Sequence, residues 1–72
     1  MTINELLKAA REQSGLTQVE LAQRLRKSQS LITAYETSRR SPGTAFLKRI
    51  HNATGINFAL VDGEWTILTN KN

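Results

Sequence analysis

The sequence predicts a mainly α-helical protein in which four short helices are followed by a C-terminal β-hairpin, and two patterns in its 72 residues support this. Four successive segments place apolar residues three and four positions apart, the spacing that gathers them on one face of a helix. The last segment instead sets an Asp-Gly dipeptide between β-forming residues, which is typical of a tight turn joining two strands. We therefore expect a helical domain at 1–56 and a hairpin with its end at 57–72.

The first two helices have clear expected limits. The first runs from Ile3 to a stop at Gly15, and its inward residues are Ile3, Leu6, Leu7 and Ala10. The second begins at the N-cap Thr17, because Glu20 three residues later completes a capping box. Its inward residues are expected to be Val19, Leu21, Ala22 and Leu25.

A third helix follows after a short basic break at Arg26 and Lys27, with Ser28 as a suitable N-cap. It is only about two turns long and carries the apolar residues Leu31, Ile32 and Tyr35. Two helices this short, joined by a tight turn, are not stable in isolation and must be held by packing. The pair is therefore expected to form a helix-turn-helix.

The polar residues and the Pro-Gly pair of 37–43 are typical of a loop. A fourth helix is expected from the N-cap Thr44 to a left-handed C-cap at Gly55, with Ile56 folded back on the last turn. Its inward residues are Phe46, Leu47, Ile50 and Ala53.

The segment after the fourth helix is expected to pair with itself. A two-residue turn at 62–63 would place Leu60 opposite Trp65 and Phe58 opposite Ile67, with all four side chains on one face. A lone hairpin with such a face is marginal in water, so these four residues either form a dimer interface with a second copy or cover the hairpin's own helices. The polar residues 69–72 are expected to be frayed.

The charge of the chain favours a polyanionic partner. Ten Lys and Arg against six Asp and Glu give a net charge of +4. Glu36 is the only acidic residue in the middle of the chain, whereas the basic residues there are Arg24, Arg26, Lys27, Arg39, Arg40, Lys48 and Arg49. This distribution favours binding to nucleic acid over an ordinary solvated surface. With no signal peptide and no long apolar run, we expect a cytoplasmic, nucleoid-associated protein and no membrane partner.

Catalysis has little support in the sequence. There is no cysteine, and His51 is the single histidine, without a nearby pair of carboxylates. No glycine-rich phosphate-binding loop is present. We therefore expect no enzyme activity, no catalytic residue, no metal site and no cofactor.

The second and third helices together meet the steric demands of a DNA-reading pair. The small Ala22 allows close approach of the two helices, and Leu25, Ile32 and Tyr35 lock their crossing angle. Three polar side chains are expected to project away from this packing, with donors and acceptors suited to base edges: Gln29, Ser30 and Thr33. Beside them lie the apolar residues Leu31 and Ala34, either of which can contact a thymine methyl group.

These motifs resemble the lambda-repressor-like, Xre-type DNA-binding domains of bacterial and phage regulators. The resemblance covers about residues 4–56 and rests on Leu16-Thr17-Gln18-x-Glu20-Leu21-Ala22, Ser28-Gln29-Ser30-x-Ile32, and Tyr35-Glu36 before Arg39-Arg40-x-Pro42. It implies a four- or five-helix bundle whose third helix enters the major groove, bound as a homodimer over a near-palindromic operator.

The resemblance also implies roles for single residues. Gln29 matches the first recognition position, and its amide is suited to contact adenine. Gln18 matches the position whose side chain supports that of the first recognition glutamine. Arg11 and Glu36 match an ion pair between the first and third helices. The residues expected to contact bases are Gln29, Ser30, Thr33 and Ala34. The residues expected to contact phosphate are Gln18, Lys27, Ser28, Thr37, Arg39 and Arg40.

The chain departs from the family pattern at two places. Arg26 stands where glycine is usual, so a residue with a side chain must adopt the left-handed region at a cost of about 1 kcal/mol. Thr37-Ser38 stands where Asn-Gly is usual, which leaves the shape of the phosphate-contacting loop open. The hairpin segment resembles the β-segment of HipB-type antitoxins, which pairs across a two-fold axis.

The function that these observations predict is a sequence-specific, double-stranded DNA-binding transcriptional repressor that acts as a homodimer, with half-sites roughly 34 Å apart. Two alternatives stay open. One is the antitoxin of a toxin–antitoxin module, which would regulate its own promoter and bind a toxin protein. The other is a protein-interaction module without DNA binding.

Overall fold

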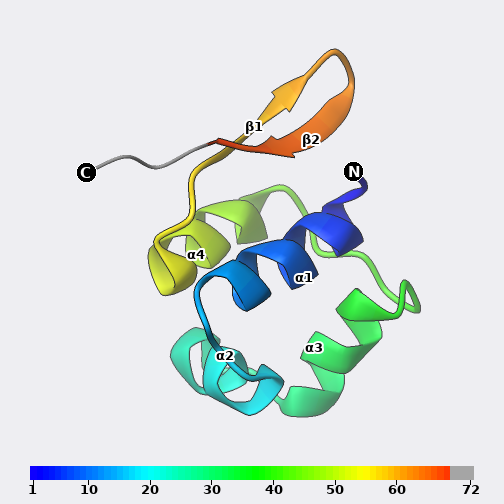
Figure 1. Ribbon diagram of the computed structural model, residues 1–72. Helices are drawn as coiled ribbons and strands as arrows, with labels where there is room; N and C mark the ends of the chain where they lie inside the picture. Colours follow the sequence, from blue (N-terminus) through cyan, green and yellow to red (C-terminus); the bar gives the residue numbers. More distant parts are fainter. Residues whose placement is uncertain (69–72) are drawn as a thin grey trace.

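The computed structural model describes residues 1–68, which form four helices and a two-stranded antiparallel sheet (Figure 1). The elements are α1 (Ile3–Gln13), α2 (Gln18–Leu25), α3 (Gln29–Glu36), α4 (Ala45–Thr54), β1 (Phe58–Val61) and β2 (Glu64–Ile67). The predicted order of helices and hairpin is confirmed. The predicted fraying of 69–72 lies outside the described residues.

All four helices contribute to one apolar core. Its buried residues are Leu6, Leu7, Ala10, Leu16, Leu21, Ala22, Leu25, Ile32, Tyr35, Leu47 and Ile50. The rings of Phe46 and Tyr35 pack in a T-shaped arrangement at a centroid distance of 5.5 Å and so join α4 to α3. Because α2 and α3 have only eight residues each, this shared core is what keeps them helical.

The prediction that Val19 points inward is wrong. Its side chain is 45% exposed, whereas Leu21, Ala22 and Leu25 are buried. These three residues form the inward stripe of α2, and at about 100° per residue Val19 lies roughly 110° around the helix axis from the centre of that stripe. Val19 is apolar, but it lies on a different face of α2 from the three buried residues.

Side-chain caps fix the starts of three helices. Thr17 and Glu20 form the predicted capping box of α2, and Ser28 Oγ accepts from the backbone N–H of Leu31 as the predicted cap of α3. A second capping box, formed by Thr2 with the glutamate three residues later, starts α1. Thr44 stands at the N-cap of α4 as predicted, but its backbone is already helical and its side chain makes no capping bond.

The carboxylate of Glu20 gives the stability of α2 a pH dependence. The backbone N–H of Thr17 donates to Glu20 Oε1 (2.9 Å) and, with the Thr17 hydroxyl, holds the pKa of Glu20 below its ordinary value of 4.5. The unfolded chain therefore binds the proton more readily, and this stabilisation is complete above about pH 4.5 and lost as the pH falls through the lowered folded-state pKa.

We expect Glu20→Gln to have a smaller free energy of unfolding than the wild type at neutral pH, and this difference to shrink as the pH falls below about 4.5. Urea denaturation at a series of pH values measures the difference. The matched control is Glu12→Gln, at an exposed position that caps no helix. A difference that is constant with pH would show that the carboxylate charge contributes nothing at this cap.

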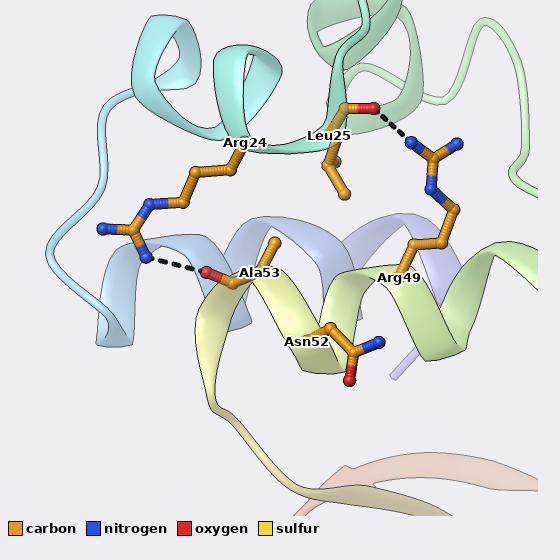
Figure 2. A pocket seen from close by; sticks show the side chains of 5 residues that line it. All are labelled: Arg24, Leu25, Arg49, Asn52 and Ala53. Carbon is orange, nitrogen blue, oxygen red and sulfur yellow. Dashed lines mark hydrogen bonds between the residues drawn. The ribbon is translucent and has the colours of Figure 1, made fainter.

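Two hydrogen bonds between arginine side chains and backbone carbonyls connect α2 and α4 (Figure 2). Arg26 ends α2 in the left-handed region with φ 56°, as predicted, and Gly55 ends α4 with φ 72°. Arg24 donates to the carbonyl of Ala53 at 2.9 Å, and Arg49 donates to the carbonyl of Leu25. Each arginine thus satisfies a carbonyl at or near the end of the other helix and adds a positive charge where the helix dipole favours one.

The hairpin has the predicted register, with Phe58 opposite Ile67 and Leu60 opposite Trp65. Its turn places 62–63 at positive φ, as a tight two-residue hairpin turn requires. Phe58, Trp65 and Ile67 pack against the core of their own chain, and Leu60 at the outer end of the same face stays 58% exposed. The hairpin therefore covers its own helices with three of the four residues proposed for a dimer interface.

Candidate nucleic-acid interface

One edge of α3 gathers the residues that were expected to contact DNA bases. Gln29, Ser30, Thr33 and Ala34 line a single shallow concavity of about 360 Å³, together with Arg39 from the loop after the helix. Gln29 and Ser30 are exposed and make no side-chain hydrogen bond within residues 1–68, so their donors and acceptors are available to a ligand. This edge combines amide, hydroxyl and methyl groups with an adjacent guanidinium, the set of groups that reads and holds duplex DNA.

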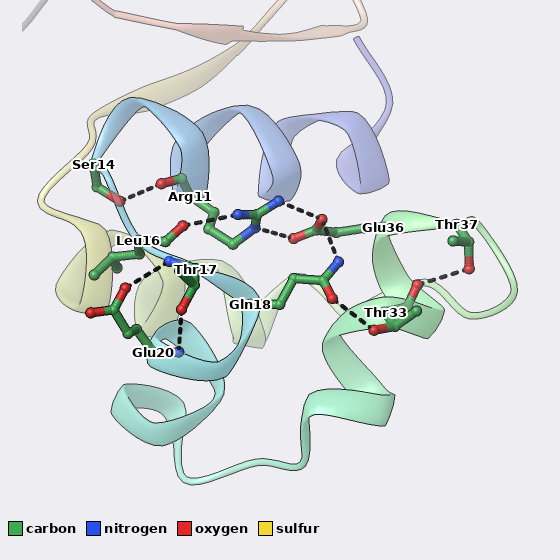
Figure 3. A network of polar contacts seen from close by, with 9 residues as sticks. All are labelled: Arg11, Ser14, Leu16, Thr17, Gln18, Glu20, Thr33, Glu36 and Thr37. Atoms are coloured by element: carbon green, nitrogen blue, oxygen red, sulfur yellow. Dashed lines mark hydrogen bonds and ion pairs between the residues drawn. The ribbon is translucent and has the colours of Figure 1, made fainter.

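Behind this edge, a chain of polar contacts connects three helices (Figure 3). Arg11 of α1 donates to Glu36 of α3 through Nε (2.6 Å) and a second guanidinium nitrogen (3.0 Å), and also to the Leu16 carbonyl (2.9 Å). Gln18 of α2 donates to the same carboxylate (3.1 Å), and its amide oxygen accepts from Thr33 Oγ1 (3.0 Å). The network thus orients α3 relative to both helices that support it.

The ion pair between Arg11 and Glu36 is largely excluded from solvent. The side chains of Arg11 and Glu36 are only 13% and 3% exposed. The Glu36 carboxylate, above all through its hydrogen bonds to the guanidinium, raises the pKa of Arg11 above its ordinary value. The bidentate geometry leaves neither group with an unsatisfied charge, which is the condition under which a buried pair is tolerated.

The position of Gln18 differs from the expectation that it buttresses Gln29. Its side chain is half-buried and bonds Glu36 and Thr33, both one or more turns further along α3. As a result Thr33 is half-buried and its hydroxyl proton is already used, so this hydroxyl can only accept from a base. Gln29 is left as the longest free polar side chain on the edge.

Three of the six residues expected to contact phosphate have free polar groups, and one of them, Arg39, lines the concavity. Lys27, Arg39 and Arg40 are exposed, and their side chains have no partner within the described part of the chain. Ser28 is exposed and uses its oxygen as the cap of α3. Thr37 is exposed as well, but its hydroxyl donates to the carbonyl of Thr33 (2.8 Å), so a phosphate contact from that hydroxyl requires this bond to break.

The loop that carries the two arginines is held by a residue that sequence reasoning missed. Asn4 is buried, and its side-chain nitrogen donates to the carbonyls of Tyr35 and Arg40, both at 2.7 Å. Its oxygen accepts from the Ser41 hydroxyl (3.2 Å). The sequence could have indicated this role, because Asn4 lies three residues before Leu7 on the inward face of α1, where a polar residue needs hydrogen-bond partners.

Backbone geometry gives the same loop its shape. Ser38 adopts the left-handed region with φ 63°, so it performs the turn for which the family pattern has glycine one position after an asparagine. The carbonyl of Ala34 then accepts from the N–H groups of both Arg39 and Arg40, at 2.9 and 3.2 Å. These bonds bring the two arginines back beside the last turn of α3.

Three further observations concern other kinds of site. Within residues 1–68, no group of three or more potential metal ligands is present. His51 Nδ1 donates to the carbonyl oxygen of Ile56 (2.9 Å) and so stabilises the turn after α4. No helix among the same residues is both long and apolar enough to cross a membrane.

The packing of α2 against α3 and the exposed polar edge of α3 define a helix-turn-helix DNA-binding domain. Comparison with known proteins agrees: a helix-turn-helix family model matches residues 7–61, and the chain belongs to this family, in its Xre-type form. Membership of this family identifies residues 7–61 as a DNA-binding domain.

Over 68 residues the chain is 34% identical to an immunity repressor protein of Bacillus phage phi105. The match covers 94% of this chain and 47% of the phage protein, so the chain spans about half the length of that relative. No solved structure gives a significant match.

Proposed function

We propose that the protein is a transcriptional repressor that binds a near-palindromic operator as a homodimer, with α3 of each copy in one major groove. In this role Gln29 and Ser30 read base edges, Ala34 contacts a thymine methyl, and Arg39, Arg40 and Lys27 contact phosphate. Binding to chromosomal or phage DNA would place the protein at the nucleoid in the cytoplasm.

One observation carries the proposal: the free side chains of Gln29 and Ser30 share a concavity with the unpaired guanidinium of Arg39. A merely solvated helix face needs no such concentration of unpartnered donors beside an unpaired cation. The printed name of the phage relative, an immunity repressor, supports repression as the outcome of binding. The antitoxin and interaction-module alternatives gain no supporting observation from residues 1–68.

The variant Gln29→Ala tests direct readout. It should weaken binding to the preferred duplex by about 10- to 100-fold, since one bidentate base contact is worth about 1–3 kcal/mol, and should leave binding to unrelated DNA unchanged. Fluorescence anisotropy with both duplexes at one fixed salt concentration measures this. Gln13→Ala makes the same change at an exposed residue of α1 and should alter neither affinity. Equal losses on both duplexes would refute base reading by Gln29.

A further inference from the structure

The hydroxyl of Thr33 is oriented differently from those of Thr37 and Thr54. Each of these two donates to the backbone carbonyl four residues earlier in the chain, at 2.8 and 2.7 Å. Thr33 Oγ1 instead donates to the side-chain oxygen of Gln18 on α2 (3.0 Å), while the residue still lines the concavity of α3. The proton of this hydroxyl therefore points at a neighbouring helix, and only the lone pairs of its oxygen are left for DNA.

The ionised carboxylate of Glu36 fixes the direction of this hydrogen bond (Figure 3). Because Glu36 is salt-bridged to Arg11, its carboxylate carries a charge and can only accept. The side-chain nitrogen of Gln18 donates to it at 3.1 Å, which turns the amide oxygen of Gln18 toward Thr33. The opposite amide orientation would set two oxygens against each other. An amide oxygen can only accept, so the hydroxyl of Thr33 has to donate to it.

We infer that the buried ion pair sets the base preference of Thr33, with Gln18 as the positioning residue between them. The Thr33 oxygen is left as an acceptor, so it can bond only a base that presents a donor in the major groove. These bases are adenine, through N6, and cytosine, through N4, whereas guanine and thymine present acceptors. Thr33 therefore selects an amino base, adenine or cytosine, on the strand that it faces. This preference belongs to the proposed operator complex and so rests on the proposed function.

The position of Thr33 on α3 suits it to this reading. It lies four residues after Gln29, so the two side chains are neighbours on the helix surface, and both line the same concavity. The side chain is half-buried and β-branched, which restricts rotation of the oxygen away from the edge. Every base pair carries one amino group in the major groove, so Thr33 distinguishes which strand carries it.

Ser30 provides an internal comparison on the same edge. Its hydroxyl is exposed and makes no hydrogen bond within residues 1–68, so it can turn either to donate or to accept. Such a hydroxyl does not separate amino bases from keto bases. The contact of Thr33 with Gln18 is what gives one of the two hydroxyls a fixed polarity.

The first experiment removes the acceptor from the protein and the donor from the DNA. Thr33→Val keeps the shape of the side chain and should bind the preferred duplex about 3- to 10-fold more weakly, the worth of one neutral hydrogen bond. Selection from random duplexes with this variant identifies the position that Thr33 reads, as the one whose preference disappears. Thr33→Ser restores the hydroxyl and should restore the preference.

At that position, purine in place of adenine, or pyrimidin-2-one in place of cytosine, removes only the amino group. Fluorescence anisotropy should show that this replacement weakens binding by the wild type about 3- to 10-fold more than binding by Thr33→Val. Equal losses in the two proteins would show that Thr33 does not accept from the amino group, and would overturn the inference.

The second experiment reverses the polarity of the positioning residue. In Gln18→Lys the ammonium can donate both to Glu36 and to the oxygen of Thr33, which frees the hydroxyl proton to donate to a base. Preference for the amino base over guanine and thymine should fall about 3- to 10-fold at the Thr33 position and stay unchanged at the position that Gln29 reads. Gln13→Lys adds the same charge at an exposed residue of α1 and should keep both preferences. An amino-base preference that survives in Gln18→Lys overturns the positioning role.

The outcomes also separate this inference from the proposed function. If the wild type enriches a site whose recognition depends on Gln29, but has a keto base or no preference at the Thr33 position, the inference is overturned and operator binding stands. If the wild type enriches no sequence at all, base reading by α3 fails and the inference fails with it.

Discussion

Replacing Glu36 by alanine should lower the free energy of unfolding by about 3–5 kcal/mol, because it leaves the guanidinium of Arg11 buried without its counter-charge. Gln18 would lose the acceptor of its side-chain N–H in the same step. For a domain of this size such a loss is a large share of the total stability. Urea denaturation followed by circular dichroism measures it.

Two control variants separate the charge from the packing. Glu36→Gln keeps an acceptor of the same shape and should lose less than Glu36→Ala. Glu12→Ala removes an exposed carboxylate from α1 and should stay within about 0.5 kcal/mol of the wild type. A loss below about 1 kcal/mol in Glu36→Ala would mean that the network does not hold α3 in place.

The second large effect is expected at the loop after α3. The double variant Arg39→Ala, Arg40→Ala should weaken DNA binding by about 100-fold at low salt, since each charge-assisted phosphate contact is worth about 1.5 kcal/mol. The slope of log K against log salt should fall by about 2, one unit for each phosphate contact. Anisotropy titrations at several salt concentrations give both quantities.

The matched control removes two positive charges elsewhere. Lys8 on α1 and Lys48 on α4 are exposed, and Lys48 lines a hollow beside the hairpin rather than the concavity of α3. The double variant Lys8→Ala, Lys48→Ala should bind DNA with a slope close to that of the wild type. If both double variants lose affinity equally, the arginines act through net charge alone.

Local chemistry explains why much of the fold could be predicted. The capping box of Thr17 and Glu20 starts α2, and the Asp-Gly turn fixes the register of the hairpin; each acts over a few residues and is legible in the sequence. Arg26 could be assigned to the left-handed region because the family that the chain resembles usually has glycine at this position. Thr44 failed as a side-chain cap because its backbone is already helical, a detail set by the preceding loop.

Tertiary packing explains what could not be predicted. The buried role of Asn4 depends on the carbonyls of Tyr35 and Arg40, more than thirty residues away. The hydroxyl of Thr33 likewise donates to Gln18 of another helix. Sequence periodicity identified the edge of α3 as polar, yet only the arrangement in space shows which of its side chains remain free.

The hairpin illustrates the same limit. Its apolar face was evident from the register, but the surface that would cover it was not. The structure places three residues of this face on the protein's own core. The contact of Met1 with Trp65 joins the hairpin to a residue 64 positions away in the sequence.

The most direct test is selection of bound sites from a pool of random DNA duplexes, with the wild-type protein and the Gln29→Ala variant in parallel. We expect the wild type to enrich a near-palindromic site whose half-sites lie about one helical turn apart, and the variant to lose preference at one position of each half-site. Recovery of the unselected pool by the wild-type protein, with no enriched sequence, would contradict base reading by α3.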